Sequence, residues 1–357
     1  MKAGWLVLSV AVVVVVALVG GCAGHGGQAP PDGGPAAAAF VGRAVCATCH
    51  AGANRAFGRY GDIAFVPGTT DPSHVYANFT GSAHGQDMRS KGPGNRNVLD
   101  NPGCVACHVV GAEEATGYTS AAATPHLEGI GCEECHGRGS LHAGTPSTAN
   151  ITKWPTASTT CWDCHGPSYK LLRNGAPPPV TDDTFLAVAP NRVAPKNRQA
   201  PFLNGYLAYN QPQLPSPHSA IENTCVTCHL SEGSSSHHGG SALRVDYDAC
   251  VVCHGSEAAA QQLVEDFEDE MNALGVELAG EDPSNPGHPD MNCNGGLLAA
   301  YAAANGINVA TNANPDSEAI KRYKAARYSF AYAFSSGTVH NPPLAERMLK
   351  DAKALVD

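Results

Sequence analysis

The stretch GCEECHGRGSLH, residues 131–142, contains two cysteines and a histidine in the pattern C-x-x-C-H, followed six residues later by a second histidine. The pattern occurs six times, with first cysteines at positions 46, 104, 132, 161, 225 and 250. A chain of 357 residues with 14 cysteines and 16 histidines is expected to contain only about 0.02 such patterns by chance. The repeat is therefore a selected feature, and the copies are called the first to sixth motif below.

C-x-x-C-H is the attachment pattern of c-type haem, in which two thiols form thioethers and the adjacent imidazole binds the iron. A zinc ribbon needs paired C-x-x-C units but no histidine after each one. A redox disulfide explains one copy, and six disulfides between neighbouring cysteines would close strained loops. The sequence thus predicts six covalently bound c-type haems. The expected thioether cysteines are Cys46, Cys49, Cys104, Cys107, Cys132, Cys135, Cys161, Cys164, Cys225, Cys228, Cys250 and Cys253. The expected proximal iron ligands are His50, His108, His136, His165, His229 and His254.

The second axial position of each iron is expected to carry another histidine, because the chain has 16 histidines and only 5 methionines. Iron with two imidazole ligands suits electron transfer and leaves no position for a substrate. His25 lies in a polar tether and is interpreted as solvated. The nine histidines that remain for six positions are His74, His84, His126, His142, His218, His237, His238, His288 and His340.

Three segments resemble the multihaem cytochrome c family that includes the tetrahaem cytochrome of ammonia oxidisers. They are FVGRAVCATCH (40–50), FTGSAHG (79–85) and GIGCEECHGRGSLH (129–142). The resemblance implies that His84 and His142 are distal ligands. It covers most of residues 40–357 in pieces, and the long insertions at 58–80 and 171–217 depart from the family pattern.

Further segments look like those of multihaem cytochromes of metal-reducing bacteria, where a histidine upstream of the motif is a ligand. SPHSAIENTCVTCH (216–229) implies His218, and SSHHGGSALRVDYDACVVCH (235–254) implies His237 or, as the open alternative, His238. The C-terminal stretch RYSFAYAFSSGTVHNPPLAERMLKDA (327–352) resembles the end of the same cytochromes and implies His340.

One distal position is left to two candidates. His126, in TPHLEGIGCEECH (124–136), repeats the arrangement in which His218 precedes its motif and is preferred. Its rival is His74, in DPSHVY (71–76). The predicted distal ligands are therefore His84, His126, His142, His218, His237 and His340.

The N-terminal residues 1–21 have one lysine followed by an apolar run too short for a confident membrane span, and are interpreted as a lipoprotein signal peptide. Val-Gly-Gly-Cys at 19–22 resembles a lipobox, which predicts lipidation of Cys22; the alternative is a plain secretory signal cut nearby. Residues 22–39 form a flexible Gly/Pro/Ala tether. We expect an exported outer-membrane lipoprotein that faces the periplasm or the cell surface.

The composition predicts a mostly irregular fold with short α-helices, organised around a chain of haems. Glycine and proline number 39 and 26 and aromatic residues make up 6%, so an ordinary hydrophobic core is hard to assemble. Residues 40–255 are predicted to form the hexahaem-binding region, in which 171–217 runs as extended or irregular chain. Apolar residues at helical spacing predict a helical C-terminal region, 256–357, that packs on haems. Helices are expected at 256–280, at 317–335 and from the prolines at 342–343 onward.

The formal net charge of −10 argues against nucleic acid as a partner and favours basic redox proteins or metal cations. The predicted function is electron transfer in the cell envelope or to extracellular acceptors. Expected partners are other cytochromes, quinol-linked complexes or extracellular acceptors, and a homo-oligomer or filament is possible. The alternative is a multihaem reductase or oxidase of a small nitrogen or sulfur compound, with one open haem. A haem-loaded structural or storage protein is a third class.

Two smaller features are interpreted as structural. Residues 290–295, DMNCNG, match the first positions of a calcium loop, but Tyr301 stands where the acidic twelfth ligand is required. An Asn/Gly turn is the preferred explanation. Cys293, within this turn, is expected to be buried or to pair with another chain.

Overall fold

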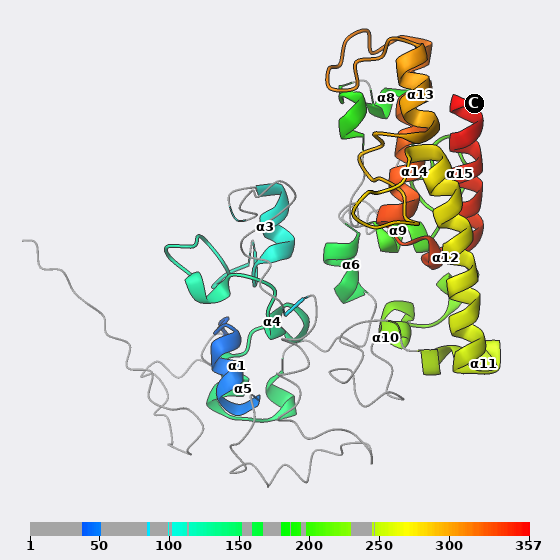
Figure 1. Cartoon of the computed structure of the whole chain (residues 1–357). Coiled ribbons are helices and arrows are strands. Elements are labelled where there is room, and N and C mark those ends of the chain that lie inside the picture. Colours follow the sequence, from blue (N-terminus) through cyan, green and yellow to red (C-terminus); the bar gives the residue numbers. More distant parts are fainter. Residues whose placement is uncertain are drawn as a thin grey trace, which may run out of the picture.

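The computed structural model describes residues 38–50, 84–85, 99, 102–112, 114–151, 159–166, 180–185, 187–193, 198–229, 245 and 247–357. Short helices joined by irregular chain make up the N-terminal part, and four longer helices stand side by side in the C-terminal part (Figure 1). Within the described residues, strand pairing is limited to isolated bridges. The predicted fold class, short α-helices with a helical C-terminal segment, is confirmed.

Each C-x-x-C-H motif lies at the end of a short helix whose last residue is the motif histidine. Two thiols and an imidazole on one helical turn can reach the same porphyrin, which is why the pattern adopts this conformation. The six helices, in chain order, are α1 (Arg43–His50), α3 (Pro102–His108), α4 (Cys132–His136), α6 (Thr159–His165), α10 (Thr224–His229) and α11 (Val251–His254). The turn η8 (Tyr247–Cys250) leads directly into α11.

The connections carry further short elements. The α-helical ones are α5 (Ser140–Gly144), α8 (Asp182–Phe185) and α9 (Gln199–Leu203). The 3-10 turns are η4 (Pro125–Leu127), η5 (Thr148–Asn150), η6 (Pro190–Arg192), η7 (Pro217–Ala220) and η9 (Thr338–His340).

The helices of the C-terminal part begin and end at recognisable signals. In α12 (Glu257–Ala279) the Ser256 hydroxyl accepts a hydrogen bond from the Ala259 N–H at 3.1 Å, and Gly280 ends the helix at a φ of 82°. The last helix, α15 (Pro342–Val356), starts with two prolines, and Asn341 caps it by accepting from the Leu344 N–H at 3.3 Å.

The other two helices are α13 (Gly296–Ala304) and α14 (Glu318–Ser335). The sequence predicted α12, α14 and α15 but not α13, whose apolar residues surround the helix without a periodic stripe.

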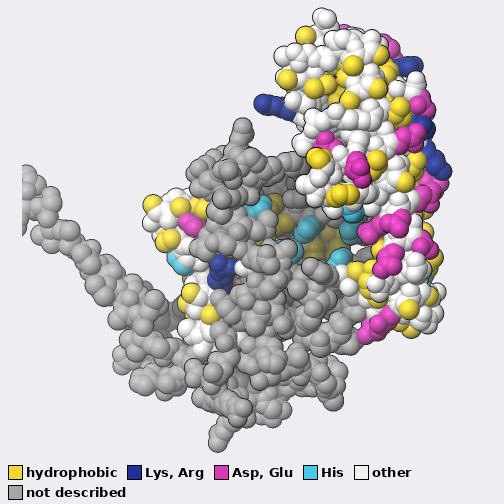
Figure 2. All heavy atoms as spheres, in the orientation of Figure 1, with side chains coloured by type: hydrophobic (Ala, Val, Ile, Leu, Met, Phe, Trp, Pro, Cys, Tyr) yellow, Lys and Arg dark blue, Asp and Glu magenta, His cyan; other side chains and the backbone are white. Residues whose placement is uncertain are grey.

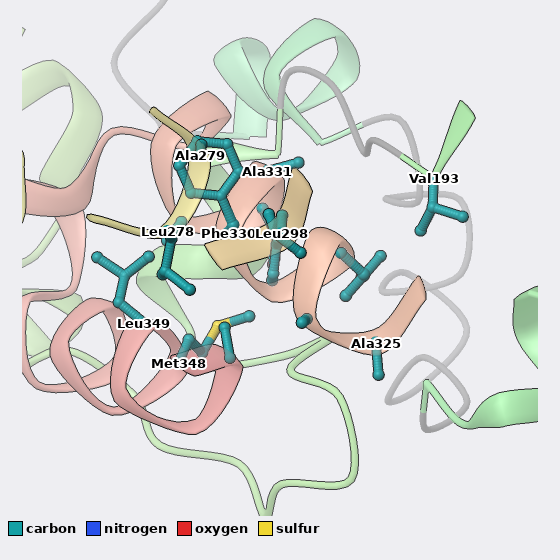
Figure 3. Close-up of a cluster of buried hydrophobic side chains, with 14 of the residues drawn as sticks. Val193, Leu278, Ala279, Leu298, Ala325, Phe330, Ala331, Met348 and Leu349 are labelled. Atoms are coloured by element: carbon teal, nitrogen blue, oxygen red, sulfur yellow. The ribbon is translucent and has the colours of Figure 1, made fainter. Parts of the chain in front are cut away.

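An extended apolar core joins these four helices. Leu278 of α12, Leu298 of α13, Phe330 of α14 and Leu349 of α15 are fully buried against one another (Figure 3). The expectation that an ordinary core is hard to assemble from this chain is therefore wrong for the C-terminal part. The apolar residues of 256–357 lie at helical spacing and face one another across the four helices, which the composition of the whole chain does not reveal.

The segment 180–215 packs on this core instead of standing apart. Phe202 is buried in it, and the Asn341 side-chain amide donates to the backbone oxygens of Phe202 and Leu214 at 2.8 and 2.7 Å. The hydroxyls of Tyr328 and Tyr332 donate to backbone oxygens of the same segment, at 2.9 Å each. Apart from the short elements α8, η6 and α9, the described residues of this segment are irregular, as predicted.

In the part of the chain that the structure describes, no helix is both long enough and apolar enough to cross a membrane.

Candidate metal centres

The fold brings four motif histidines close to four histidines that are remote from them in sequence. All eight residues were predicted as iron ligands from the sequence. The ring centroids are 6.3 Å apart for His50 and His142, 5.8 Å for His84 and His165, 6.1 Å for His218 and His254, and 6.2 Å for His229 and His340.

This spacing fits a metal ion held between two imidazoles. Each nitrogen lies about 2 Å from a bound metal, so two rings that bind it from opposite sides have centres about 6 Å apart. Rings in direct van der Waals stacking would be closer. The interplanar angles fall into two classes, 17° and 29° for the pairs of His50 and His229, and 64° and 63° for those of His84 and His218.

Short local elements place the remote histidines. His142 lies on α5, directly after the third motif, and His340 lies on η9 between α14 and α15. His218 lies on η7, where the Ser216 hydroxyl accepts from the His218 N–H at 3.2 Å. The turn that carries His84 is joined to α1 by a hydrogen bond from the Arg43 guanidinium to the Gly85 carbonyl, at 3.1 Å.

Hydrogen bonds to Nδ1 orient three of these rings. The Nδ1 atom of His142 lies 2.9 Å from the Ser147 carbonyl oxygen, and that of His340 lies 2.8 Å from the Ser336 carbonyl oxygen. Metal-bound histidines usually donate their second ring nitrogen to a carbonyl or carboxylate in this way, which leaves Nε2 for the metal. The donor set therefore fits iron.

His165 is oriented by a side chain that sequence reasoning missed. Its Nδ1 lies 3.2 Å from the Gln199 Oε1 atom, and the Gln199 amide donates to the Ser335 carbonyl at 3.4 Å. Gln199 thereby ties this ring to the end of α14. A single glutamine within a proline-rich stretch carries no signal in the sequence that could have identified it.

Burial favours the neutral, metal-binding form of several of these imidazoles. Burial lowers the pKa of His50, His218 and His340, and the facing histidine of each pair lowers it further. Burial likewise lowers the pKa of His108.

The motifs that are neighbours in space are not always neighbours in the sequence. The thiols of Cys46 and Cys132 are hydrogen-bonded, so the first and third motifs are in contact. The helices of the second and fourth motifs, α3 and α6, are also in contact.

The fourth, fifth and sixth motifs are also neighbours in space, which connects the N-terminal motifs to the C-terminal part. Burial lowers the pKa of His84, and repulsion from His165 and then from His229 lowers it further, so the rings of the fourth and fifth motifs are close. Burial raises the pKa of Cys228 to about 11, with a contribution from Cys250, so the fifth and sixth motifs are neighbours.

Several predicted residues are not brought into a ring pair. His126 lies on η4 with an exposed side chain, near Gly42. His288 is exposed in the loop before α13. His74, His237 and His238 lie outside the described residues, as does the predicted lipidation site Cys22. The distal ligands of the second and third motifs therefore stay predictions.

The 290–295 stretch is a self-contained turn. The Asp290 carboxylate accepts hydrogen bonds from the Asn292 N–H at 2.8 Å and from the side-chain amide of Asn294 at 2.8 Å. Across the described residues, no group of three or more His, Cys, Asp or Glu side chains is placed to hold a metal ion by itself. Cys293 is a buried free thiol, and burial raises its pKa to about 11.

Comparison with known proteins agrees with this geometry. The family model described as "Cytochrome c554 and c-prime" matches residues 45–137, from the first motif through the third. C-type polyheme cytochrome OmcB of Geobacter sulfurreducens is 27% identical over 208 residues, which cover 49% of this chain and 28% of OmcB. Cytochrome c-554 of Nitrosomonas europaea is 53% identical over 36 residues, which cover 10% of this chain and 15% of that protein. The matched region therefore spans less than a third of either relative.

Two solved structures show a partial likeness. The Outer Cell Wall Cytochrome OcwA superposes with a TM-score of 0.42 at 17% identity, covering 79% of this chain and 48% of that one. The undecaheme cytochrome from the S-layer of Carboxydothermus ferrireducens gives 0.42 at 20% identity, covering 88% and 45%.

The repeated motifs, the family model that spans three of them and the polyhaem relatives all point to the same cofactor and class of protein. The chain is thus similar to multihaem c-type cytochromes, most specifically over residues 45–137.

Proposed function

We propose that this protein is a hexahaem electron carrier in which each C-x-x-C-H motif holds one haem. The observation that carries the proposal is the set of four ring pairs with centroids 5.8 to 6.3 Å apart. In each pair the motif histidine is the proximal ligand. The distal ligands are His142 for the first motif, His84 for the fourth, His340 for the fifth and His218 for the sixth.

The remaining distal positions, those of the second and third motifs, are assigned to His126 and to His237 or its neighbour His238. His126 has an exposed side chain, so its assignment requires η4 to turn toward a haem. His74 remains its rival.

The haems supply one-electron chemistry through their iron, and the polypeptide fixes their spacing and burial. The contacts between motifs support a path that runs from the first to the third motif and from the second to the fourth, fifth and sixth. Gly111, three residues after the second motif, donates to the Glu134 carboxylate of the third at 2.6 Å, which connects the two groups. The protein then acts as a conduit rather than a catalyst.

The sixth motif is the point where we propose that a partner exchanges electrons. Val252, at a variable position inside the motif, is 92% exposed. Glu265 and Glu268 on the neighbouring α12 lie close enough to Tyr247, three residues before Cys250, to contribute to its raised pKa, which is caused mainly by burial. Along the lower right edge of the molecule in Figure 2, Asp and Glu side chains outnumber Lys and Arg side chains.

This charge favours a basic redox protein as the partner, because opposite charge accelerates encounter. No lysine or arginine occurs between Arg244 and Lys321. The rate of electron exchange with a basic cytochrome should fall as ionic strength rises. Glu265→Gln and Glu268→Gln should weaken that dependence, whereas a rate unaffected by salt would contradict this docking site.

We further propose that the protein is exported and anchored through a lipidated Cys22, and that it works in the cell envelope or toward extracellular acceptors. The apolar run at 5–19 and the Val-Gly-Gly-Cys sequence support this. Metabolic labelling with a fatty acid should label the wild-type protein but not Cys22→Ser. Labelling of both proteins would contradict lipidation at this position.

The mass of the mature protein is the direct test of the haem count. Six haems covalently attached to one chain are expected, with a matching haem-to-protein ratio from the pyridine haemochrome spectrum. A smaller number in fully matured protein would contradict the proposal.

A second candidate function has one supporting observation. Among the described residues, no histidine ring pairs with His108, the motif histidine of α3. An iron there with a free sixth position could bind a small nitrogen or sulfur compound. A carbon monoxide difference spectrum of the fully reduced protein separates the two functions: no binding supports the conduit, and prompt uptake by one haem equivalent supports the enzyme.

A further inference from the structure

The third motif, Cys132-Glu-Glu-Cys-His136, contains a buried carboxylate at the first of its two variable positions. Glu133 is 4% exposed. Its Oε1 atom accepts from the N–H groups of Val41 and Gly139, at 2.9 and 2.7 Å, and its Oε2 atom accepts from that of Gly42 at 2.7 Å. Because all these partners are donors, the carboxylate is bound in its ionised form.

These hydrogen bonds join the first motif to the third. Val41 and Gly42 immediately precede α1, which carries the first motif, and Gly139 immediately precedes α5, which carries His142. Gly139 has little space for a side chain, since an added Cβ atom would lie 2.9 Å from the Glu133 Oε1 atom.

Glu134, at the second variable position, makes the corresponding bond to the second motif. Its Oε1 atom accepts from the Gly111 N–H at 2.6 Å. Gly111 lies at a φ of 65°, and an added Cβ atom would meet the Phe40 ring at 2.5 Å. The two adjacent glutamates thus bind the backbones next to two different motifs.

The Glu133 carboxylate lies beside two predicted haem attachment points, Cys46 and Cys132. The thiols of Cys46 and Cys132 are in hydrogen-bond contact, and the Glu133 charge is close enough to disfavour a second negative charge on either. A buried negative charge stabilises ferric over ferrous haem, because the oxidised centre carries one more positive charge.

We propose that Glu133 and Glu134 are positioning residues that hold the first three motifs at fixed spacing, and that the Glu133 carboxylate lowers the midpoint potentials of the first and third haems. The proposal rests on the function proposed above, since it takes both motifs to carry haem. It makes this end of the conduit more reducing than it would be without the carboxylate.

Redox titration of the intact, haem-loaded protein tests the charge effect. Glu133→Gln should raise the potentials of two haems and leave the others unchanged. Glu133→Asp keeps the charge and should leave all potentials near their wild-type values. Glu114→Gln is the matched control, because Glu114 is a carboxylate of the same region whose side chain is 57% exposed; it should also shift nothing. A purely structural role would instead make Glu133→Gln and Glu133→Asp behave alike.

Amide hydrogen exchange tests the positioning effect even if Glu133→Gln loads haem poorly. The amides of Val41, Gly42 and Gly139 should exchange faster in Glu133→Asp than in Glu114→Gln, because the shorter side chain withdraws the acceptor oxygens. Equal exchange in the two variants, or unchanged potentials in a fully loaded Glu133→Gln protein, would overturn the proposal. A wild-type protein that lacks haem at these motifs would instead overturn the proposed function, and the haem stoichiometry reveals that case separately.

Discussion

The N-terminal and C-terminal parts of this molecule are held together by different means. The C-terminal part, 256–357 with 180–215 packed on it, has an extended apolar core that includes Phe202, Phe330 and Leu349. In the N-terminal part, the described apolar cluster consists of Phe40, Val110 and Leu127 with Tyr118 against it. Hydrogen bonds such as those to Glu133 also connect its described segments.

This difference indicates that the N-terminal part is the one that needs a cofactor to complete its apolar core. A cluster of three buried apolar side chains cannot offset the conformational entropy of ordering the segments that surround it. In the proposed assignment, haems between the paired histidines would supply the missing apolar volume and cross-link the chain through thioethers. The C-terminal helices have a core of their own and would receive haems at their margin, where histidine side chains gather (Figure 2).

The largest expected effect is that of withholding haem. In cells that lack the machinery for c-type haem attachment, the N-terminal part should be unfolded while the C-terminal helices persist. Limited proteolysis and hydrogen exchange should find 38–151 unprotected and α12, α14 and α15 protected, with the mature protein as the control. Equal protection of both parts would contradict the inference that only the N-terminal part depends on haem to fold.

A cavity in the C-terminal core should be costly and confined to that part. Leu349 is fully buried, so Leu349→Ala should lower the free energy of unfolding by about 2–5 kcal/mol. Leu263→Ala is the control, because Leu263 on α12 is 55% exposed and should cost less than about 0.5 kcal/mol. Denaturant unfolding followed by far-UV circular dichroism measures both. A similar cost for the two variants would argue against this core.

Exchanging one distal ligand should change one haem at the boundary between the two parts. His340 faces His229 at 6.2 Å, and a methionine in its place should raise the potential of that haem by on the order of 0.1 V, since methionine ligation favours ferrous iron. The exposed His288 provides the control variant His288→Met. Potentiometric titration should show one shifted haem in the first variant and none in the second. An unshifted titration of His340→Met would exclude His340 as a ligand.

The smallest effect concerns the cap between the sixth motif and the C-terminal core. Ser256→Ala removes the side-chain bond to the Ala259 N–H and should cost about 1 kcal/mol. Ser317→Ala is matched to it, because Ser317 occupies the same position before α14 and makes no capping bond through its side chain. Thermal unfolding should separate the two variants. Equal melting temperatures would mean that the cap contributes nothing.

The sequence by itself determined the features that are local. The C-x-x-C-H pattern predicts a short helix that ends at its histidine, because one porphyrin must be reached by three side chains on a single turn. Helix caps and apolar spacing likewise predicted α12, α14 and α15. The resemblance to known multihaem cytochromes implied His84, His142, His218 and His340, which the fold brings to four motif histidines.

Only the tertiary structure decided which histidine faces which motif and how the motifs are arranged in space. The second and third motifs lie between His84 and His165 in the sequence, and no local rule pairs residues across such a distance. The contacts of Glu133, Glu134 and Gln199 were equally hidden, since each is a polar side chain whose role depends on backbone groups brought to it from elsewhere. Local spacing constrains one turn of chain, whereas pairing across the molecule depends on how whole segments pack.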